Sequence, residues 1–181
     1  MAELNPVAEP SHAPTPVGGV PRWLDRLITG WGLAGGVLFC AIVAMSIVSI
    51  LGRKLLASPI QGDMELLQMG AAIGSAAFLP LCELYDHHIK VDALTTWMSE
   101  RGRAVLDTLA HTLLLGVALL LTWRTALYML EAHENQEVST LLLVPLWQPV
   151  ALLVPSFVLL ALAALSRVNA SLRVAVKGAA A

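Results

Sequence analysis

Long stretches without charged residues separate short polar segments along the chain. Residues 27–52, 66–82 and 138–166 contain no Asp, Glu, Lys or Arg, and residues 108–130 contain only Arg124. A helix rises about 1.5 Å per residue and the hydrocarbon core of a bilayer is about 30 Å thick, so about 20 apolar residues are needed to cross it. This pattern predicts an all-α integral membrane protein with four transmembrane helices, over about 31–51, 64–82, 105–130 and 146–165.

The segments outside these spans differ in character. Residues 1–21 are rich in proline and poor in apolar side chains, which predicts a disordered tail. Residues 22–166 form the predicted four-helix membrane domain, and residues 167–181 a cytoplasmic tail. Between the second and third spans, the apolar residues of segment 91–103 follow helical spacing. This spacing predicts an amphipathic helix lying in the membrane interface.

The overall composition agrees with a membrane protein. Hydrophobic residues make up 57% of the chain and charged residues 13%, and the mean hydropathy is +0.72. A soluble domain of 181 residues needs more charge to cover its surface. The formal net charge of −2 offers no basic surface to nucleic acid, so we expect the lipid bilayer as a partner and no nucleic acid.

The positions of Lys and Arg predict the orientation. Only Arg53 and Lys54 lie on one side of the predicted bundle. Eight lie on the other side: Arg22, Arg26, Lys90, Arg101, Arg103, Arg167, Arg173 and Lys177. Because positive residues accumulate in cytoplasmic flanks, we expect both termini in the cytoplasm and the third loop, 131–145, outside.

Small residues four positions apart occur in the first two spans. Gly32 and Gly36 form such a pair in the first span, and Gly70 and Gly74 form one in the second. Small residues at this spacing let helix backbones approach closely in a membrane. These glycines therefore predict helix packing, either within the chain or against another subunit.

Arg124 is the one charge well inside a predicted span. Charges in the membrane are usually paired, functional or extended to the surface. The predicted topology puts Glu65 at the same outer boundary, which suggests an Arg124–Glu65 ion pair, with Arg53 as a competitor for the same carboxylate. The alternatives are snorkelling of Arg124 to the surface and a transport or proton-relay role.

A polar cluster follows the second span. It reads Glu83-Leu-Tyr-Asp-His-His88-Ile-Lys-Val-Asp92, which suggests a metal site, although such residues at a membrane boundary are more often simply solvated. His88 together with His111 could ligate a haem. The chain contains no Walker loop, G-x-S-x-G elbow or zinc spacing, so we expect no enzyme and no catalytic residues. A proton-coupled exporter normally has an acid deep within a helix, and none of the predicted spans has one.

Several short motifs occur in a recognisable order. An Arg follows the first span and an acid opens the second, a His-Ile-x-Val-Asp stretch follows the second, and a Ser-Thr loop leads through Leu-x-x-Pro-x-Trp into the last. The residues are Arg53, Glu65, His88 to Asp92, Ser139-Thr140, and Leu142 to Trp147 with Pro145. This chain, from about Trp23 to Leu165, resembles the small membrane subunit of tripartite ATP-independent periplasmic (TRAP) transporters, the DctQ-like family.

The resemblance implies a subunit of the bacterial cytoplasmic (inner) membrane without a substrate, metal or cofactor site of its own. It would form an obligate pair with a large membrane subunit that carries the solute and sodium sites. This chain would support that subunit and the docking of a periplasmic binding protein, which delivers a small organic solute such as a carboxylate. Candidate structural or partner-contact residues are Arg53, Glu65, His88, Asp92, Arg124, Pro145 and Trp147. The alternatives are a haem-carrying anchor subunit of a redox complex and a small proton-coupled exporter.

Overall fold

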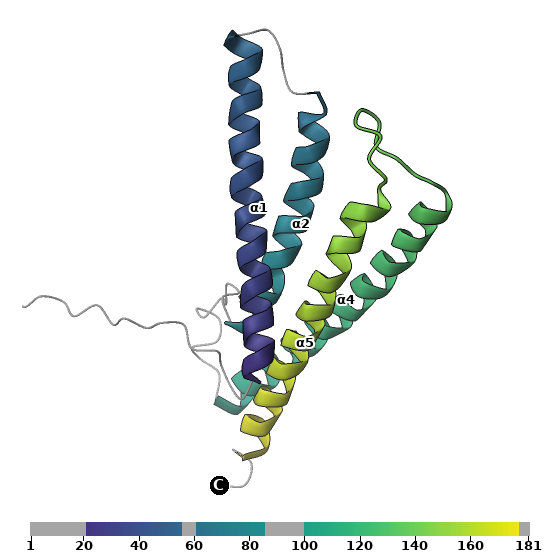
Figure 1. The fold of residues 1–181 in the computed structure, drawn as a ribbon. Helices are drawn as coiled ribbons and strands as arrows, with labels where there is room; N and C mark the ends of the chain where they lie inside the picture. The colour runs from purple at the N-terminus through teal and green to yellow at the C-terminus, as the bar shows by residue number, and fades with distance from the viewer. Residues whose placement is uncertain (1–20, 56–60, 86–99, 178–181) are drawn as a thin grey trace, which may run out of the picture.

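A computed structural model of the chain describes residues 21–55, 61–85 and 100–177. These residues form four α-helices: α1 (Arg22–Leu55), α2 (Asp63–Leu84), α4 (Glu100–Glu134) and α5 (Trp147–Lys177). The helices run alternately up and down in Figure 1. All four are long and apolar enough to cross a membrane, which confirms the predicted all-α class with four spanning helices. The predicted disordered tail lies outside the described residues, apart from Pro21.

Every helix reaches or passes the ends of its predicted span, except that α5 begins one residue later. The first begins at Arg22, directly after Pro21, whose carbonyl accepts hydrogen bonds from the amides of Leu24 and Asp25. The last continues to Lys177. The apolar pattern predicts only the part of a helix that lies in the hydrocarbon core of the membrane. The helix itself is longer, because the backbone hydrogen bonds continue into the polar residues on either side.

The predicted interfacial helix over 91–103 stays a prediction. Residues 91–99 lie outside the described part of the chain, but Glu100 begins α4, so 100–103 form the first turn of the third long helix. A helical period alone does not show where one helix ends and the next begins.

The helices pack in the spatial order α1, α2, α5, α4. At one end of the bundle, α1 and α4 begin and α2 and α5 end; we call this the tail end. The opposite end carries the 135–146 connection between α4 and α5, and we call it the loop end. In Figure 1, the α1–α2 pair and the α4–α5 pair converge at the tail end and separate towards the loop end.

The four predicted packing glycines all lie between α1 and α2. Gly32 and Gly36 face Leu81 and Phe78 of α2, and Gly70 and Gly74 face Ile42 and Phe39 of α1. A fifth residue, Gly35, lies against the α2 backbone: an added Cβ there would lie 3.3 Å from the carbonyl oxygen of Gly74 and 2.7 Å from the Cβ of Ala77. Within this chain, the small residues therefore serve packing between neighbouring helices.

Side chains from three helices form the core at the tail end. Leu24 and Ile28 of α1 pack with Leu84 of α2 and Ala163 of α5. Two polar links join the same helices. The Tyr85 hydroxyl donates to Asp25 over 3.1 Å. The indole of Trp31 donates over 2.8 Å to the hydroxyl of Ser156, which is fully buried.

Candidate functional site

The first turn of α2 is the centre of the polar contacts at the loop end. Gly62 precedes it with a φ of 74°, a left-handed conformation that glycine adopts without steric cost. Asp63 then reaches towards α1: its carboxylate accepts hydrogen bonds from the Ser49 hydroxyl over 2.6 Å and from the Arg53 guanidinium over 3.0 Å. The first turn of α2 is thereby attached to the last turns of α1.

Glu65, two residues later, binds the connection between α4 and α5 instead. One carboxylate oxygen accepts the backbone amide of Leu141 over 2.8 Å, and the other accepts that of Leu142 over 3.0 Å. The Leu142 side chain packs against Gly62 so closely that a Cβ there would clash. Gly62 is thus required both by its backbone conformation and by the side chain above it.

The 135–146 connection is a compact, internally bonded loop. Val138 and Pro145 form an antiparallel bridge, and the Leu146 amide donates to the Glu137 carbonyl over 2.9 Å. Inside this bridge, the Ser139 amide donates to the Val144 carbonyl, also over 2.9 Å. Together with the bonds to Glu65, these contacts hold the loop tip, 140–143, over the beginning of α2.

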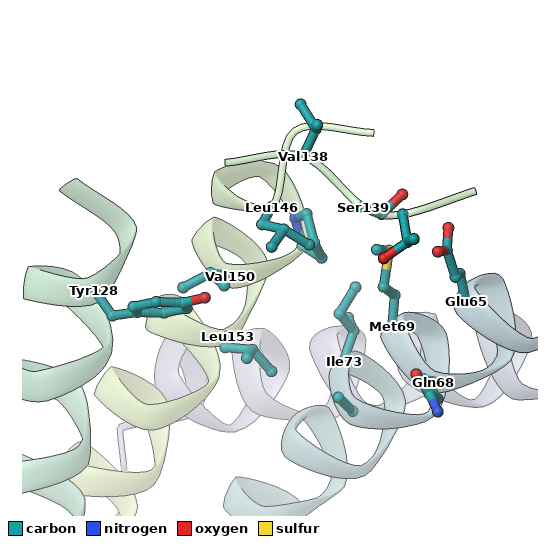
Figure 2. Close-up of a pocket in the computed structure, with 13 residues that line it drawn as sticks. Glu65, Gln68, Met69, Ile73, Tyr128, Val138, Ser139, Leu146, Val150 and Leu153 are labelled. Carbon is teal, nitrogen blue, oxygen red and sulfur yellow. The ribbon is translucent and has the colours of Figure 1, made fainter. Parts of the chain in front are cut away.

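A cavity of about 400 Å³ lies beneath this loop, between α2 and α5. Figure 2 shows Val138 and Ser139 above it, Glu65 and Gln68 on the α2 side, and Tyr128 of α4 on the far side. Its deeper wall is apolar and includes Ile73 and Leu153. The polar lining comes from Glu65, Ser139 and Thr140 beside the loop and from Gln68 and Tyr128 deeper in the cavity.

A second cavity of about 390 Å³ lies between α1, α2 and α5. Met69, Ile73 and Pro149 line both cavities, so the half of α2 nearest the loop end has open space on two sides. The lining of the second cavity is almost wholly apolar. This space corresponds to the separation of the helix pairs towards the loop end.

The predicted Arg124–Glu65 ion pair is wrong. Glu65 is occupied by the loop amides, and Arg124 is an exposed residue of α4 that forms no ion pair with it. The alternative partner, Arg53, binds Asp63 rather than Glu65. Backbone amides compete well for a carboxylate because they are already fixed in space, whereas a long Arg side chain loses conformational freedom on pairing.

Pro145 and Trp147 lie where the loop enters α5. Pro145 belongs to the bridge with Val138, and Trp147 is the first residue of the helix. The Trp147 ring meets His133 of α4 edge-on, with ring centroids 5.3 Å apart. These residues close the α4–α5 connection at the loop end.

Glu83 belongs to the polar cluster predicted after the second span. The structure describes this residue, and it is not solvated. It is fully buried, and its carboxylate lies 2.7 Å from Nδ1 of His111 on α4. Helical spacing places Glu83 on the same face of α2 as the buried residues Ala76 and Pro80. This spacing can be seen in the sequence and would have indicated a buried Glu83, but its polar neighbours favoured a solvated cluster. The other His and acidic residues of the cluster, with His88 and Asp92, lie outside the described residues.

The described residues contain no group of three His, Cys, Asp or Glu side chains placed to hold a metal ion. His111, one of the two residues considered for haem ligation, lies with Nδ1 2.7 Å from Glu83, and the other, His88, lies outside the described residues. The geometry of the described part of the chain is therefore one of helix attachment at both ends: Asp63 and Glu65 at the loop end, and Glu83 at the tail end.

Comparison with known families decides the class of protein. The family described as tripartite ATP-independent periplasmic transporters, DctQ component, matches residues 42–174. The chain belongs to the DctQ family. Neither the search of curated proteins nor the search of solved structures gave a match.

Membership makes this DctQ chain a membrane component of a transporter and not an enzyme. The matched range contains Asp63, Glu65 and the whole 135–146 loop, so the loop-end contacts belong to the region that defines the family. The haem-carrying anchor and the autonomous exporter lose their support, because neither is the role of a DctQ component.

Proposed function

We propose that this DctQ chain is the non-catalytic small subunit of a sodium-coupled TRAP transporter that takes up a small organic solute such as a carboxylate. The observation that carries the proposal is the family match over residues 42–174, which contains all of α2 and α4 and most of α5. Sodium coupling and the class of solute follow from the family resemblance noted in the sequence.

The exposed apolar surface of the bundle supports a role beside a large membrane subunit. α1 exposes apolar side chains along its length, among them Leu33, Val37, Val43, Ile47 and Leu51. α4 has a large contact area with α5 alone and exposes a comparable series from Leu106 to Leu130. We propose that one of these surfaces binds the large subunit and that lipid covers the rest.

Three polar residues, Arg124, His88 and Asp92, are proposed contacts of the large subunit. Arg124 is exposed on α4, so its guanidinium is available to an acidic group of a neighbouring helix. His88 and Asp92 belong to the motif on which the resemblance rests, and we propose the same role for them. The Lys and Arg distribution supports a cytoplasmic position for both termini, which puts the loop end on the periplasmic side of the inner membrane.

Reconstitution into proteoliposomes tests the proposal. The solute is identified first, from a thermal-shift screen of carboxylates against the purified binding protein. We expect uptake of that radiolabelled solute only when this chain, the large subunit, the binding protein and an inward sodium gradient are all present. Uptake by this chain alone would restore the exporter interpretation, and haem absorption bands in the purified chain would restore the redox one.

A further inference from the structure

The tip of the loop presents two leucines that the described bundle does not cover. Leu141 and Leu143 are 68% and 67% exposed, whereas Leu142 between them packs against Gly62. Leu143 has a φ of 55°, a left-handed conformation that favours glycine. Neither burial within the described bundle nor the backbone conformation accounts for apolar side chains at these two positions, so we looked for a surface outside the chain that they contact.

The contacts of the tip place it at the level where the helices leave the hydrocarbon core. Glu65, whose carboxylate accepts two amides of the tip, lies two residues after Asp63, or about 3 Å along α2. Asp63 is paired with Arg53, the first charged residue after the charge-free run 27–52. In Figure 1, the loop extends less far than the end of α1. A tip bound at this level lies at the boundary of the membrane and does not project beyond the bundle.

Other side chains at the loop end are typical of a membrane–water boundary. Trp147 begins α5, and the Tyr128 hydroxyl donates to Glu137 over 3.3 Å. Trp and Tyr accumulate at this depth because their rings are apolar at one end and form hydrogen bonds at the other. Met64, in the first turn of α2, is 58% exposed, and Leu55 at the end of α1 is 77% exposed. The leucines of the tip therefore belong to a series of exposed apolar side chains at this boundary.

Lys54 is the charged side chain in this region for which the described residues provide neither an ion pair nor a hydrogen bond. Its neighbour Arg53 is bound to Asp63, and Glu65 is bound to the loop amides, whereas Lys54 is exposed at the end of α1. A Lys side chain can lay its apolar stem along a leaflet while its ammonium group reaches a lipid phosphate. Exposed apolar residues accompanied by a Lys are the combination that binds an anionic lipid surface.

We infer that the loop tip is a lipid-binding surface: Leu141 and Leu143 enter the leaflet at the loop end, and Lys54 binds the phosphate of an anionic phospholipid. This inference goes beyond the proposed function, because it requires neither the solute nor the large subunit. The tip is already held by Glu65, so little conformational entropy is lost when its leucines enter the lipid. Lipid would thereby fix the α4–α5 connection at the end where the helix pairs separate.

Site-directed fluorescence in nanodiscs tests the inference. The nanodiscs contain phosphatidylcholine and phosphatidylglycerol, and the chain carries Cys40→Ala, Cys82→Ala and one new cysteine with an environment-sensitive fluorophore. At Leu141→Cys we expect the emission of an apolar environment and strong quenching by phospholipids that carry a nitroxide near the headgroup. Asn135→Cys, exposed at the α4 end of the connection, is the matched control and should show water-like emission with little quenching. Water-like emission at both positions would overturn the inference.

Substitution of the second leucine tests the apolar contact. Leu143→Gly removes the side chain and favours the observed backbone conformation, so it should shift the emission of the Leu141→Cys label towards that of Asn135→Cys and reduce its quenching. Unchanged quenching would contradict entry of Leu143 into the leaflet. If hydrogen exchange shows that Leu143→Gly detaches the tip from Glu65, the reverse arrangement decides, with the label on Leu143→Cys and Leu141→Ser as the test variant.

The choice of lipid tests the role of Lys54. Nitroxide-labelled phosphatidylglycerol should be enriched about fivefold over labelled phosphatidylcholine at the Leu141→Cys label, as expected for one basic side chain at a membrane surface. Lys54→Gln should abolish this preference, and Lys54→Arg should retain it. Equal quenching by the two lipids in wild type and in Lys54→Gln would overturn the assignment of Lys54 to a lipid phosphate.

The same label distinguishes lipid from protein partners. We expect quenching by lipid both in the chain alone and in its complex with the large subunit. Apolar emission without lipid quenching, found only in that complex, would assign the tip to the large subunit and overturn the inference. Apolar emission that appears only after a solute-binding protein is added would assign the tip to that protein, with the same consequence.

Discussion

Glu65 is the third residue of α2, a position where a carboxylate often turns back to cap its own helix. Here it accepts two amides from a loop 76 and 77 residues away in sequence. A single side chain thus attaches the tip of the α4–α5 connection to α2. Asp63, the first residue of α2, binds Ser49 and Arg53 of α1.

Hydrogen exchange tests the role of Glu65 directly. In Glu65→Leu, we expect the amides of Leu141 and Leu142 to exchange much faster than in wild type, because both lose their acceptor. Glu65→Gln should give an intermediate result, since its side chain retains one carbonyl oxygen. The measurement is mass spectrometry of a peptide that covers 138–146. Glu131→Gln, an exposed acid nearby, should leave that peptide unchanged; equal protection in all three variants would contradict the assignment.

At the other end, the buried Glu83–His111 contact predicts a coupled effect on stability. His111→Leu alone removes one hydrogen-bond partner of a buried carboxyl group, which costs about 1–3 kcal/mol. Glu83→Leu alone leaves the His111 ring nitrogen in the same situation. The double substitution should recover much of the loss, because apolar pairs often replace buried polar pairs without great cost.

Unfolding of the purified chain in mixed detergent micelles measures these differences. Thr112→Val, on the exposed side of the same turn, should change the free energy of unfolding by less than about 0.5 kcal/mol. Strictly additive effects of Glu83→Leu and His111→Leu would show that the two side chains do not interact.

At the scale of elements, the contact between α1 and α2 depends on the absence of side chains. Gly35 and Gly74 bring the two backbones together, and Phe39 and Ile42 fill the space over Gly74 and Gly70. Packing of this kind is the main attraction between helices in a membrane, where no hydrophobic effect operates between them. α4, in contrast, joins the bundle mainly through α5.

Alanine substitutions at two glycines of α1 should therefore act in opposite directions. Gly35→Ala puts a methyl group 2.7 Å from the Ala77 Cβ and should destabilise by about 1–3 kcal/mol. Gly30→Ala meets no atom within 4 Å and should stabilise by about 0.5–1 kcal/mol through its higher helix propensity. The same unfolding assay measures both. A destabilising Gly30→Ala would indicate that the exposed face of α1 is covered in the purified protein.

At the scale of the whole molecule, the bundle is closed at the tail end and open at the loop end. The buried apolar cluster of α1, α2 and α5 lies at the tail end, whereas the two cavities flank the half of α2 nearest the loop end. The loop crosses this open end and is attached to α2 through Glu65. An ordered surface is thereby maintained at the end where the helices themselves separate.

The Lys and Arg distribution predicts which end faces which compartment. In a chain with Cys40→Ala and Cys82→Ala, a single cysteine at Asn135, which is exposed, should react with a membrane-impermeant maleimide added to spheroplasts. A single cysteine at Ser99 should react only after the membrane is opened. The reverse result would place the loop end in the cytoplasm and contradict the proposed orientation.

The sequence by itself determined the class of fold and the number of spanning helices. Both depend on the length of apolar stretches, which is a property of the chain in one dimension. Short motifs around Arg53, Glu65 and Trp147 were also enough to recognise the family that the comparison then established. The glycines at positions 32 and 70 predicted close helix packing, because a residue without a side chain lets a neighbouring helix approach closely whichever helix that is.

Only the tertiary structure decided which groups the charged residues bind. Glu65 binds backbone amides, and nearly every residue type has a backbone amide, so the sequence does not show which amides will be its partners. The opposite charge of Arg124 therefore suggested the wrong partner for Glu65. Glu83 looked like one of several solvated acids until the packing of α2 against its neighbours placed it inside the bundle beside His111. Partners separated by 28 to 77 residues are selected by how helices pack in three dimensions, and residue type alone does not contain that information.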